Sequence, residues 1–318
     1  MNESLTTLID SHRILVVGDI MLDRYWSGSV TRISPEAPVP VVSVDSVTEC
    51  VGGAGNVAAN IRRIGAQCCL LSIVGDDASG RLLNSLLAES GVDRHLHIDT
   101  ENRTTEKLRV VSQNQQLIRV DFEGAPSVSL TECVLDDYER LLAGVSVVVV
   151  SDYGKGGLSN VPQIVSLARR HEIPVVVDPK GADFSDYRDA SIVTPNTMEF
   201  VRCVGDCQTT EEFNKKAYSL VEKLSLQGLL VTRGSEGMTL FTEDGECIHQ
   251  SSNVRQVYDV SGAGDTVVAA IAVFLACGMS WNEILKYADT AAGIAVGKFG
   301  TATVTLPEIL SQLERETV

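Results

Sequence analysis

The chain has 318 residues, 44% of them hydrophobic and 21% charged, and a formal net charge of −16. These values are typical of a globular protein large enough for one big α/β domain or two smaller domains, and the negative charge argues against nucleic acid or an anionic membrane as a partner. No secretory signal precedes Ile14, no apolar stretch is long enough to span a bilayer, and the eight cysteines are scattered, so we expect a cytoplasmic protein with reduced thiols.

Short β-branched runs alternate with segments of helical pattern along most of the chain. The predicted strands are Ile14–Val17, Leu70–Val74, Val147–Val150, Val175–Val177, Ile192–Thr194 and Leu229–Val231. The predicted helices are Asn56–Ile64, Ser79–Ser90, Val161–Arg170, Thr210–Lys223, Gly264–Cys277, Trp281–Val296 and Pro307–Arg315. Continuous Val and Ile runs separated by helix-length segments are typical of a buried parallel sheet. The sequence therefore predicts an α/β fold with a doubly wound, mostly parallel sheet flanked by helices.

Two segments interrupt this alternation, at about residues 26–44 and 104–122. The second contains two alternating strands, Thr105–Val111 and Gln116–Phe122, joined near Asn114. We interpret both segments as insertions that form a small antiparallel β lid on a single domain covering residues 1–318, although an excursion at the sheet edge would give the same pattern. The predicted lid concentrates basic residues in an acidic chain, which would suit an anionic ligand if they are not simply solvated: Arg32, Lys107, Arg109 and Arg119.

Polar residues follow the first predicted strand and precede the first predicted long helix. Asp23 lies just beyond the strand that ends at Val17, at the edge where open α/β sheets bind ligands, and could accept hydrogen bonds from sugar hydroxyls. Gly52 and Gly53 allow close approach of a ligand to the backbone, and Asn56 offers an amide to hydroxyl groups. The alternatives are a turn cap for Asp23 and an ordinary glycine turn.

Two further polar motifs follow later strands. Asn196 and Glu199 are spaced to share a helix face, where the carboxylate could hold Mg²⁺ through water, although a capping box would give the same spacing. The turn from Thr232 through Arg233 to Gly237 would suit nucleotide phosphates, or would simply connect a hairpin.

The segment Gly262-Ala263-Gly264-Asp265 precedes an apolar helical run. A small-residue loop at the start of a helix presents unpaired backbone N–H groups and the positive end of the helix dipole, which bind anions. A carboxylate at Asp265 would repel such an anion, so its task would be to take a proton from a hydroxyl that attacks a phosphate. The alternative is a first-turn acid that complements the helix dipole.

The order of these motifs along essentially the whole chain resembles the ribokinase-like (PfkB) carbohydrate kinases. The resemblance implies the ribokinase-like fold, an ATP-dependent phosphotransferase with ATP and Mg²⁺ as cofactors, and a homodimer formed through the lid. It implies that Asp265 is the catalytic base, that Gly262, Ala263 and Gly264 form the anion hole, and that Glu199 is the metal residue. The implied nucleotide-site residues are Asn196, Glu199, Lys180, Thr232, Arg233, Gly234 and Gly237. The implied substrate-site residues are Asp23, Gly52, Gly53, Asn56, Arg109, Asp152 and Lys155.

Further strings narrow the resemblance. Residues 23–26, 32–40, 105–119, 151–156 and 178–181 are similar to the members of this family that phosphorylate D-glycero-β-D-manno-heptose 7-phosphate at O1, in ADP-heptose synthesis for lipopolysaccharide core. For the 7-phosphate, the candidate cations are Lys155, Arg109 and Arg32. Asp259 and the Gly300 region match a monovalent-cation site of some members. No adenylyltransferase signature is visible, so the resemblance implies a kinase without that second activity, or a separated kinase half.

Three alternatives remain beside this interpretation. One is another sugar or sugar-phosphate kinase of the same family, and another is a non-catalytic nucleotide or sugar sensor with the same fold. A dinucleotide-dependent oxidoreductase is disfavoured because no G-x-G-x-x-G follows the first strand. We expect His95 and His97 to be surface residues on a strand rather than metal ligands, and Cys203 and Cys207 to reflect helix packing rather than a zinc site.

Overall fold

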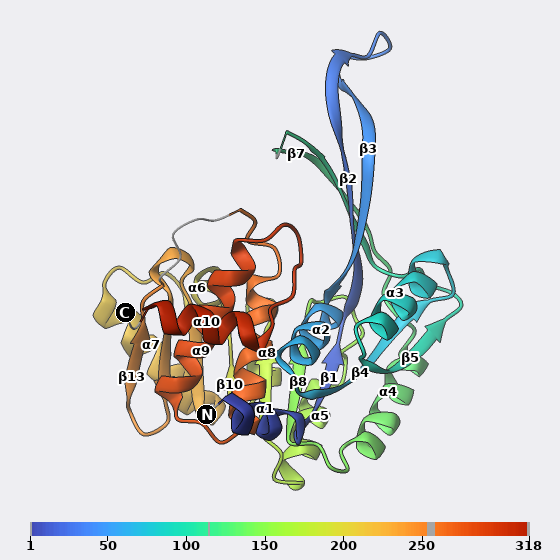
Figure 1. Cartoon of the computed structure of the whole chain (residues 1–318). Coiled ribbons are helices and arrows are strands. Elements are labelled where there is room, and N and C mark those ends of the chain that lie inside the picture. The colour runs from blue at the N-terminus through green and yellow to red at the C-terminus, as the bar shows by residue number, and fades with distance from the viewer. Residues whose placement is uncertain (1, 114, 253–257, 317–318) are drawn as a thin grey trace.

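The computed structural model has an α/β body from which a long β lid projects at one side (Figure 1). It describes residues 2–113, 115–252 and 258–316. Asn114, where we expected the second lid hairpin to turn, lies outside the described residues. Within the described ranges, no helix combines the length and the apolar character needed to cross a membrane.

The body is built on a nine-stranded sheet in the order β13-β12-β11-β10-β9-β8-β1-β4-β5. Its strands are β1 (Arg13–Gly18), β4 (Gln67–Gly75), β5 (Asp93–Asp99), β8 (Val147–Ser151), β9 (Val175–Asp178), β10 (Ile192–Val193), β11 (Gly228–Thr232), β12 (Met238–Thr242) and β13 (Cys247–Gln250). Neighbours from β5 to β11 pair in parallel, while β12 and β13 add an antiparallel edge. The predicted doubly wound, mostly parallel sheet is thus confirmed. The strands β12 and β13 were not among the predicted strands, and β5 was expected only as the strand that carries His95 and His97.

Helices cover both faces of this sheet, and each face has its own apolar core. The helices are α1 (Asn2–Asp10), α2 (Ala54–Ile64), α3 (Ala78–Glu89), α4 (Val128–Leu141), α5 (Val161–Arg170), α6 (Thr197–Val204), α7 (Thr210–Leu224), α8 (Ala263–Ala276), α9 (Trp281–Val296) and α10 (Leu306–Glu316). Because side chains alternate along a strand, Ile14 and Val16 of β1 enter the core beneath α2 and α8, while Leu15 and Val17 enter the core beneath α4 and α5. Every predicted helix is present; α1, α4 and α6 had not been listed.

The lid is a four-stranded sheet in the order β3-β2-β6-β7. It consists of β2 (Ile20–Ile33), β3 (Pro40–Gly53), β6 (Glu106–Ser112) and β7 (Gln115–Phe122). The first hairpin is longer than residues 26–44, since both of its strands have 14 residues and extend down to the body. The prediction of an antiparallel lid is correct for each hairpin but wrong at the centre, where β2 and β6 pair in parallel. The two hairpins leave the body separately and in the same direction, so their inner strands run side by side.

The lid has two chemically different faces. One carries Asp23 and Tyr25 of β2 next to their register partners Lys107 and Arg109 of β6. This face is turned to the body, since the Tyr25 ring lies 5.1 Å from the ring of Phe299. The opposite face carries a row of apolar side chains in register across all four strands, which we call the lid row: Val47, Trp26, Val110 and Ile118.

Candidate active site

The predicted site residues gather at the carboxyl ends of the parallel strands. Asp152 follows β8, Lys180 follows β9, Asn196 follows β10 and Thr232 ends β11. The N-termini of α2 and α8 reach the same edge, where Asn56 meets Asp265. In the sheet, β1 lies between β8 and β4, so the chain crosses to opposite sides of β1. Such a switch point leaves a crevice at the strand ends where α/β proteins bind ligands.

Asp265 lies in the first turn of α8, whose N-cap residue Gly262 has a left-handed φ of 75°. A Cβ at Gly262 would collide with the amide nitrogen of Asn56. The Asp265 carboxylate is only 4% exposed and accepts two hydrogen bonds, from Asn56 Nδ2 at 2.7 Å and from the Tyr153 hydroxyl at 2.5 Å. The first-turn position agrees with the dipole alternative, and the two side-chain donors in addition fix the orientation of the buried carboxylate.

Burial raises the pKa of Asp265 to about 6, against the lowering effect of the hydrogen bonds from Tyr153 and Asn56. A carboxylate with this pKa is ionised in most molecules at pH 7 and is a stronger proton acceptor than an exposed aspartate. It is therefore suited to general-base chemistry near neutral pH.

The glycine segment before α2 brings the lid and the helix N-terminus together. Gly53 has a φ of 58°, and a Cβ at Gly52 would collide with the Asp23 carboxylate. Asn56 is fully buried, with its amide nitrogen directed to Asp265 and its amide oxygen directed to Asn60. We expected Asn56 to offer its amide to sugar hydroxyls; in this structure the amide nitrogen donates to Asp265, and a contact with sugar stays a prediction.

A pocket opens beside Asp265 and contains most of the predicted nucleotide residues. Its lining includes Asp152, Tyr153, Asp178, Lys180, Asn196, Glu199, Thr232, Gly262, Gly264 and Asp265. Four of these carry carboxylates and Lys180 is the only lysine or arginine among them. Oxygen donors of this kind are the ligands that Mg²⁺ prefers, so the residues present fit a divalent cation accompanied by phosphates.

Glu199 has two structural partners in this pocket. Asn196 and Glu199 form a capping box at the start of α6, with bonds of 2.9 and 3.1 Å, and Lys180 Nζ lies 3.3 Å from Glu199 Oε1. The capping alternative is therefore correct as a local structure. It also fixes the carboxylate at the pocket wall, so it does not compete with the cation interpretation.

Of the predicted nucleotide residues in the turn after β11, only Thr232 lines the pocket beside Asp265. The turn requires glycine at Gly237, where φ is 91° and a Cβ would collide with the backbone of Gln250. Arg233, however, pairs with Glu236 at 2.5 Å and stacks over Phe213. The guanidinium is not among the groups that line the pocket beside Asp265, and its contact with the nucleotide stays a prediction.

The three basic side chains predicted to bind the 7-phosphate lie in different surroundings. Arg109 pairs with Asp23 at 2.5 Å, and Asp23 is 3% exposed. Lys155, in the loop that follows β8, pairs with Glu123 at 2.5 Å. Arg32 is exposed near the outer end of β2, roughly 30 Å along the strand from Asp23, so it cannot reach the same chain's site.

Three residues at the site were not among the predicted site residues. Asp19 accepts backbone N–H bonds from Tyr153, Lys155 and Gly157 and so holds the loop that carries Tyr153. Lys107 lies with its Nζ 5.3 Å from the centre of the Tyr153 ring, and burial lowers its pKa. Asp178 could have been found from the rule that ligands bind at strand ends, because it ends β9.

Asp259 links two loops at the edge of the site. Its carboxylate accepts the N–H groups of Ser261 at 2.9 Å and Gly300 at 3.1 Å. The structure therefore brings together the two positions expected at a monovalent-cation site, as a hydrogen-bonded junction.

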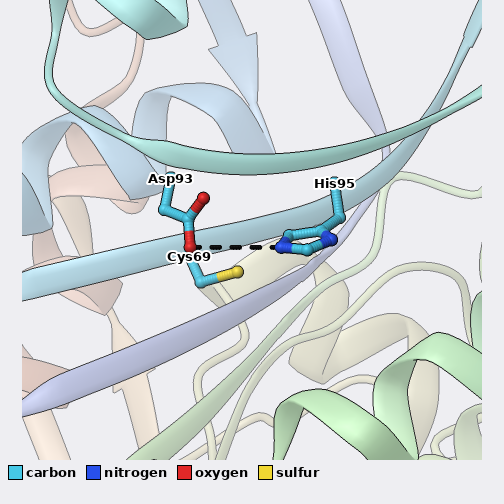
Figure 2. Close-up of side chains that lie close together, drawn as sticks. All are labelled: Cys69, Asp93 and His95. Atoms are coloured by element: carbon cyan, nitrogen blue, oxygen red, sulfur yellow. Dashed lines mark ion pairs between the residues drawn. The ribbon is translucent and has the colours of Figure 1, made fainter.

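A second cluster with metal-ligand chemistry lies away from this edge, at Cys69, Asp93 and His95 (Figure 2). Their ligand atoms lie within 4.8 Å of one another. Arg13 already supplies a cation there, since its Nη2 is 3.2 Å from Asp93 Oδ2, and burial raises the pKa of the Cys69 thiol to about 11. A neutral thiol beside a guanidinium is a poor cation site, so we assign this cluster a structural role at the edge of the sheet.

Comparison with known proteins is consistent with this geometry. A model of the pfkB family carbohydrate kinases matches residues 11–309. The chain is 47% identical to the D-beta-D-heptose 7-phosphate kinase of Bordetella bronchiseptica, over 98% of this chain and 99% of that protein. It is 48% identical to the bifunctional protein HldE of Stutzerimonas stutzeri over 96% of this chain, and it spans only 65% of that relative's length.

Solved structures share the fold at lower identity. Phosphofructokinase-2 from Escherichia coli in complex with potassium aligns with a TM-score of 0.83 and 20% identity, over 96% of this chain and 99% of that chain. Arabidopsis thaliana ribokinase complexed with ribose and ATP aligns with a TM-score of 0.76 and 23% identity, over 95% and 99%. These likenesses show the fold alone.

Proposed function

The chain belongs to the pfkB family of carbohydrate kinases, and we propose that it transfers the γ-phosphoryl group of ATP to O1 of D-glycero-β-D-manno-heptose 7-phosphate. The observation that carries the chemistry is Asp265, a buried carboxylate between two donors, with a carboxylate-lined pocket beside it. The substrate is proposed from the name of the Bordetella relative, which matches this chain end to end. In the same way, we propose that the product serves ADP-heptose synthesis.

The proposed reaction needs a base, an anion site and a place for the leaving nucleotide. Asp265 takes the proton of the O1 hydroxyl as O1 attacks the γ-phosphorus, and ADP leaves as the bond from phosphorus to the β–γ bridging oxygen breaks. The first-turn N–H groups of α8, at Gly264 and its neighbours, would face the negative charge that develops on the transferring group. Asn196, Glu199 and Thr232 would line the nucleotide side. Mg²⁺ held near Glu199 would neutralise phosphate charge when bound.

The heptose would lie between Asp265 and the inner face of the lid. Asp23 accepts hydrogen bonds there, with Gly52 leaving room for it. For the 7-phosphate we propose Arg109 and Lys155, each of which would exchange its present carboxylate partner for, or share it with, the ligand. A monovalent cation near Asp259 and Gly300 is a further proposal, supported by their junction.

We also infer a homodimer formed through the lid. The lid row presents apolar side chains to solvent, with Val47 54%, Trp26 38% and Ile118 55% exposed. A row of this kind across four strands is what a second copy of the same lid could cover.

A phosphorylation assay tests the substrate. Purified protein with ATP and Mg²⁺ is offered heptose 7-phosphate, sedoheptulose 7-phosphate, fructose 6-phosphate or ribose, and ADP release is followed. We expect heptose 7-phosphate to give the highest kcat/KM, since the cations contribute binding only when a phosphate is present. Equal turnover of ribose would reject the heptose assignment, and no ADP release with any sugar would favour a sensor.

A further inference from the structure

The amide of Asn56 belongs to a chain of hydrogen bonds that starts far along the sequence. The backbone N–H of Val304 donates to Asn60 Oδ1 at 3.1 Å. Asn60 Nδ2 donates to Asn56 Oδ1 at 3.2 Å and to the Asn56 carbonyl at 3.0 Å. Asn56 Nδ2 then donates to Asp265 Oδ2 at 2.7 Å. Asn56 and Asn60 are both fully buried.

The backbone N–H of Val304 sets which atoms donate and which accept along this series of hydrogen bonds. An amide side chain can rotate by 180° and exchange its oxygen and nitrogen, so its orientation depends on its partners. A backbone N–H can only donate, so the end of Asn60 that faces Val304 must be the oxygen. The Asn60 nitrogen must then face Asn56, which turns the Asn56 oxygen toward it. The Asn56 nitrogen is left to face Asp265.

The segment that supplies the Val304 N–H is itself anchored. Val304 is fully buried in the core beneath α2 and α8. Thr301 Oγ1 donates to the Val51 carbonyl at 3.2 Å, and Lys298 Nζ donates to the Thr303 carbonyl at 2.8 Å. The orientation imposed on Asn60 thus comes from a fixed element rather than from a mobile loop.

We propose that Asn60 is a positioning residue that holds the Asn56 amide nitrogen on Asp265 and thereby keeps Asp265 ionised and oriented as the base. Without Asn60, Asn56 can turn its oxygen toward the carboxylate, where two acceptors repel. The base would then lose one of its two side-chain donors. The role as a base in this inference rests on the proposed function, whereas the orientation of the carboxylate does not.

The charged and titratable groups around Asp265 come from several elements. Tyr153, in the loop after β8, donates a hydrogen bond to Asp265. In the lid, the charge of Asp23 raises the pKa of Asp265 and the charge of Lys107 lowers it. Asp178 acts from the end of β9. None of them contacts Asn60 through a hydrogen bond or ion pair found in the described part of the chain, so a change at Asn60 reaches Asp265 through Asn56.

The test is a titration that needs no substrate. The carboxyl ¹³C signal of Asp265 is followed by NMR in the full chain, identified by its loss in Asp265→Asn. In Asn60→Leu, which is similar in size, we expect the Asp265 midpoint to rise by roughly one pH unit, because a donor to the charged form is lost. The acid limb of the pH profile of kcat should move by the same amount, so kcat should be about twofold lower at pH 7 and about tenfold lower at pH 5, with KM for ATP unchanged.

Two comparisons separate positioning from a general structural effect. In an Asn56→Leu background, Asn60→Leu should add no further shift, since its route is already broken. Asn160→Leu serves as a matched control, because Asn160 is part-buried and donates to the Thr131 carbonyl away from this site. If Asn60→Leu does not fold, Asn60→Ala is titrated instead.

An unchanged Asp265 midpoint in a folded Asn60 variant would overturn the proposal, and so would an equal added shift in the Asn56→Leu background. If the wild-type protein phosphorylates none of the sugars, the proposed function fails while the titration still decides the role of Asn60.

Discussion

The pocket around Asp265 and the outer face of the lid differ in whether their side chains find partners within the same chain. In the pocket, polar side chains are buried and find partners from distant parts of the same chain, as Asp265 does with Asn56 and Tyr153. On the outer face of the lid, apolar side chains such as Val47 and Ile118 are more than half exposed. A buried polar network is stable only when every member is satisfied, whereas an exposed apolar row is stabilised by being covered.

This difference assigns separate tasks to the two regions. The pocket is preorganised within one chain, so its chemistry should depend on single side chains and on pH. The lid exposes apolar side chains that we propose a second copy covers, so its contribution should depend on protein concentration. Four predictions test that division, beginning with the largest effect.

Asp265→Asn keeps the shape of the side chain but removes the proton acceptor. We expect kcat to fall on the order of 10²–10⁴-fold, with ATP binding retained or slightly tighter because a negative charge near the γ-phosphate is gone. Steady-state kinetics and equilibrium ATP binding measure the two quantities. Turnover near that of the wild type would remove Asp265 from the mechanism.

Ile118→Asp places a carboxylate in the lid row. We expect self-association to weaken by about 100-fold, because the covered row would have to bury an unpaired charge in each copy. Sedimentation over a range of concentrations measures this, with Leu8→Asp as the control, since Leu8 is 42% exposed on α1 and outside the lid. A fully active wild-type monomer would show that the lid is complete without a partner.

The same Asp265→Asn variant should be more stable than the wild type at high pH. Folding raises the pKa of Asp265 from 3.8 to about 6, so the folded chain favours the protonated form. Above pH 6 the buried carboxylate is ionised at a cost of at most about 3 kcal/mol, which the neutral amide avoids. The difference in melting temperature should be largest near pH 8 and should shrink as the pH falls through 6 toward 4. A constant difference across this range would contradict the raised pKa.

Tyr153→Phe removes the second donor to Asp265 with little change in volume. Loss of a hydrogen bond to the charged form should raise the pKa of Asp265 above about 6. The midpoint of the acid limb in the pH profile of kcat should therefore rise by roughly half to one pH unit. Activity should be largely recovered at pH 8.5. A uniform loss of activity at every pH would instead indicate that the hydroxyl contacts substrate.

Much of the fold could be read from the sequence because the buried strands are continuous runs of Val and Ile. The runs Val147–Val150 and Val175–Val177 became β8 and β9 with boundaries shifted by one residue at the carboxyl end. The strand β5 was harder, since an edge strand is half-exposed and its sequence includes Asp93, Arg94 and two histidines. The parallel pairing of β2 with β6 was not predictable from two separate hairpin patterns.

The sequence by itself determined the residue types and their order: glycines before α2 and α8, an acid in the first turn of α8, and polar residues after each strand. Local rules suffice for these, because helix starts and strand ends are set by neighbouring residues. Only the tertiary structure decided which side chains meet. It brought the Asn56 amide to Asp265, paired Arg109 with Asp23, and brought the Tyr153 hydroxyl to Asp265. Such pairings join residues far apart in the chain, and burial then raises the pKa of Asp265. Neither follows from local pattern.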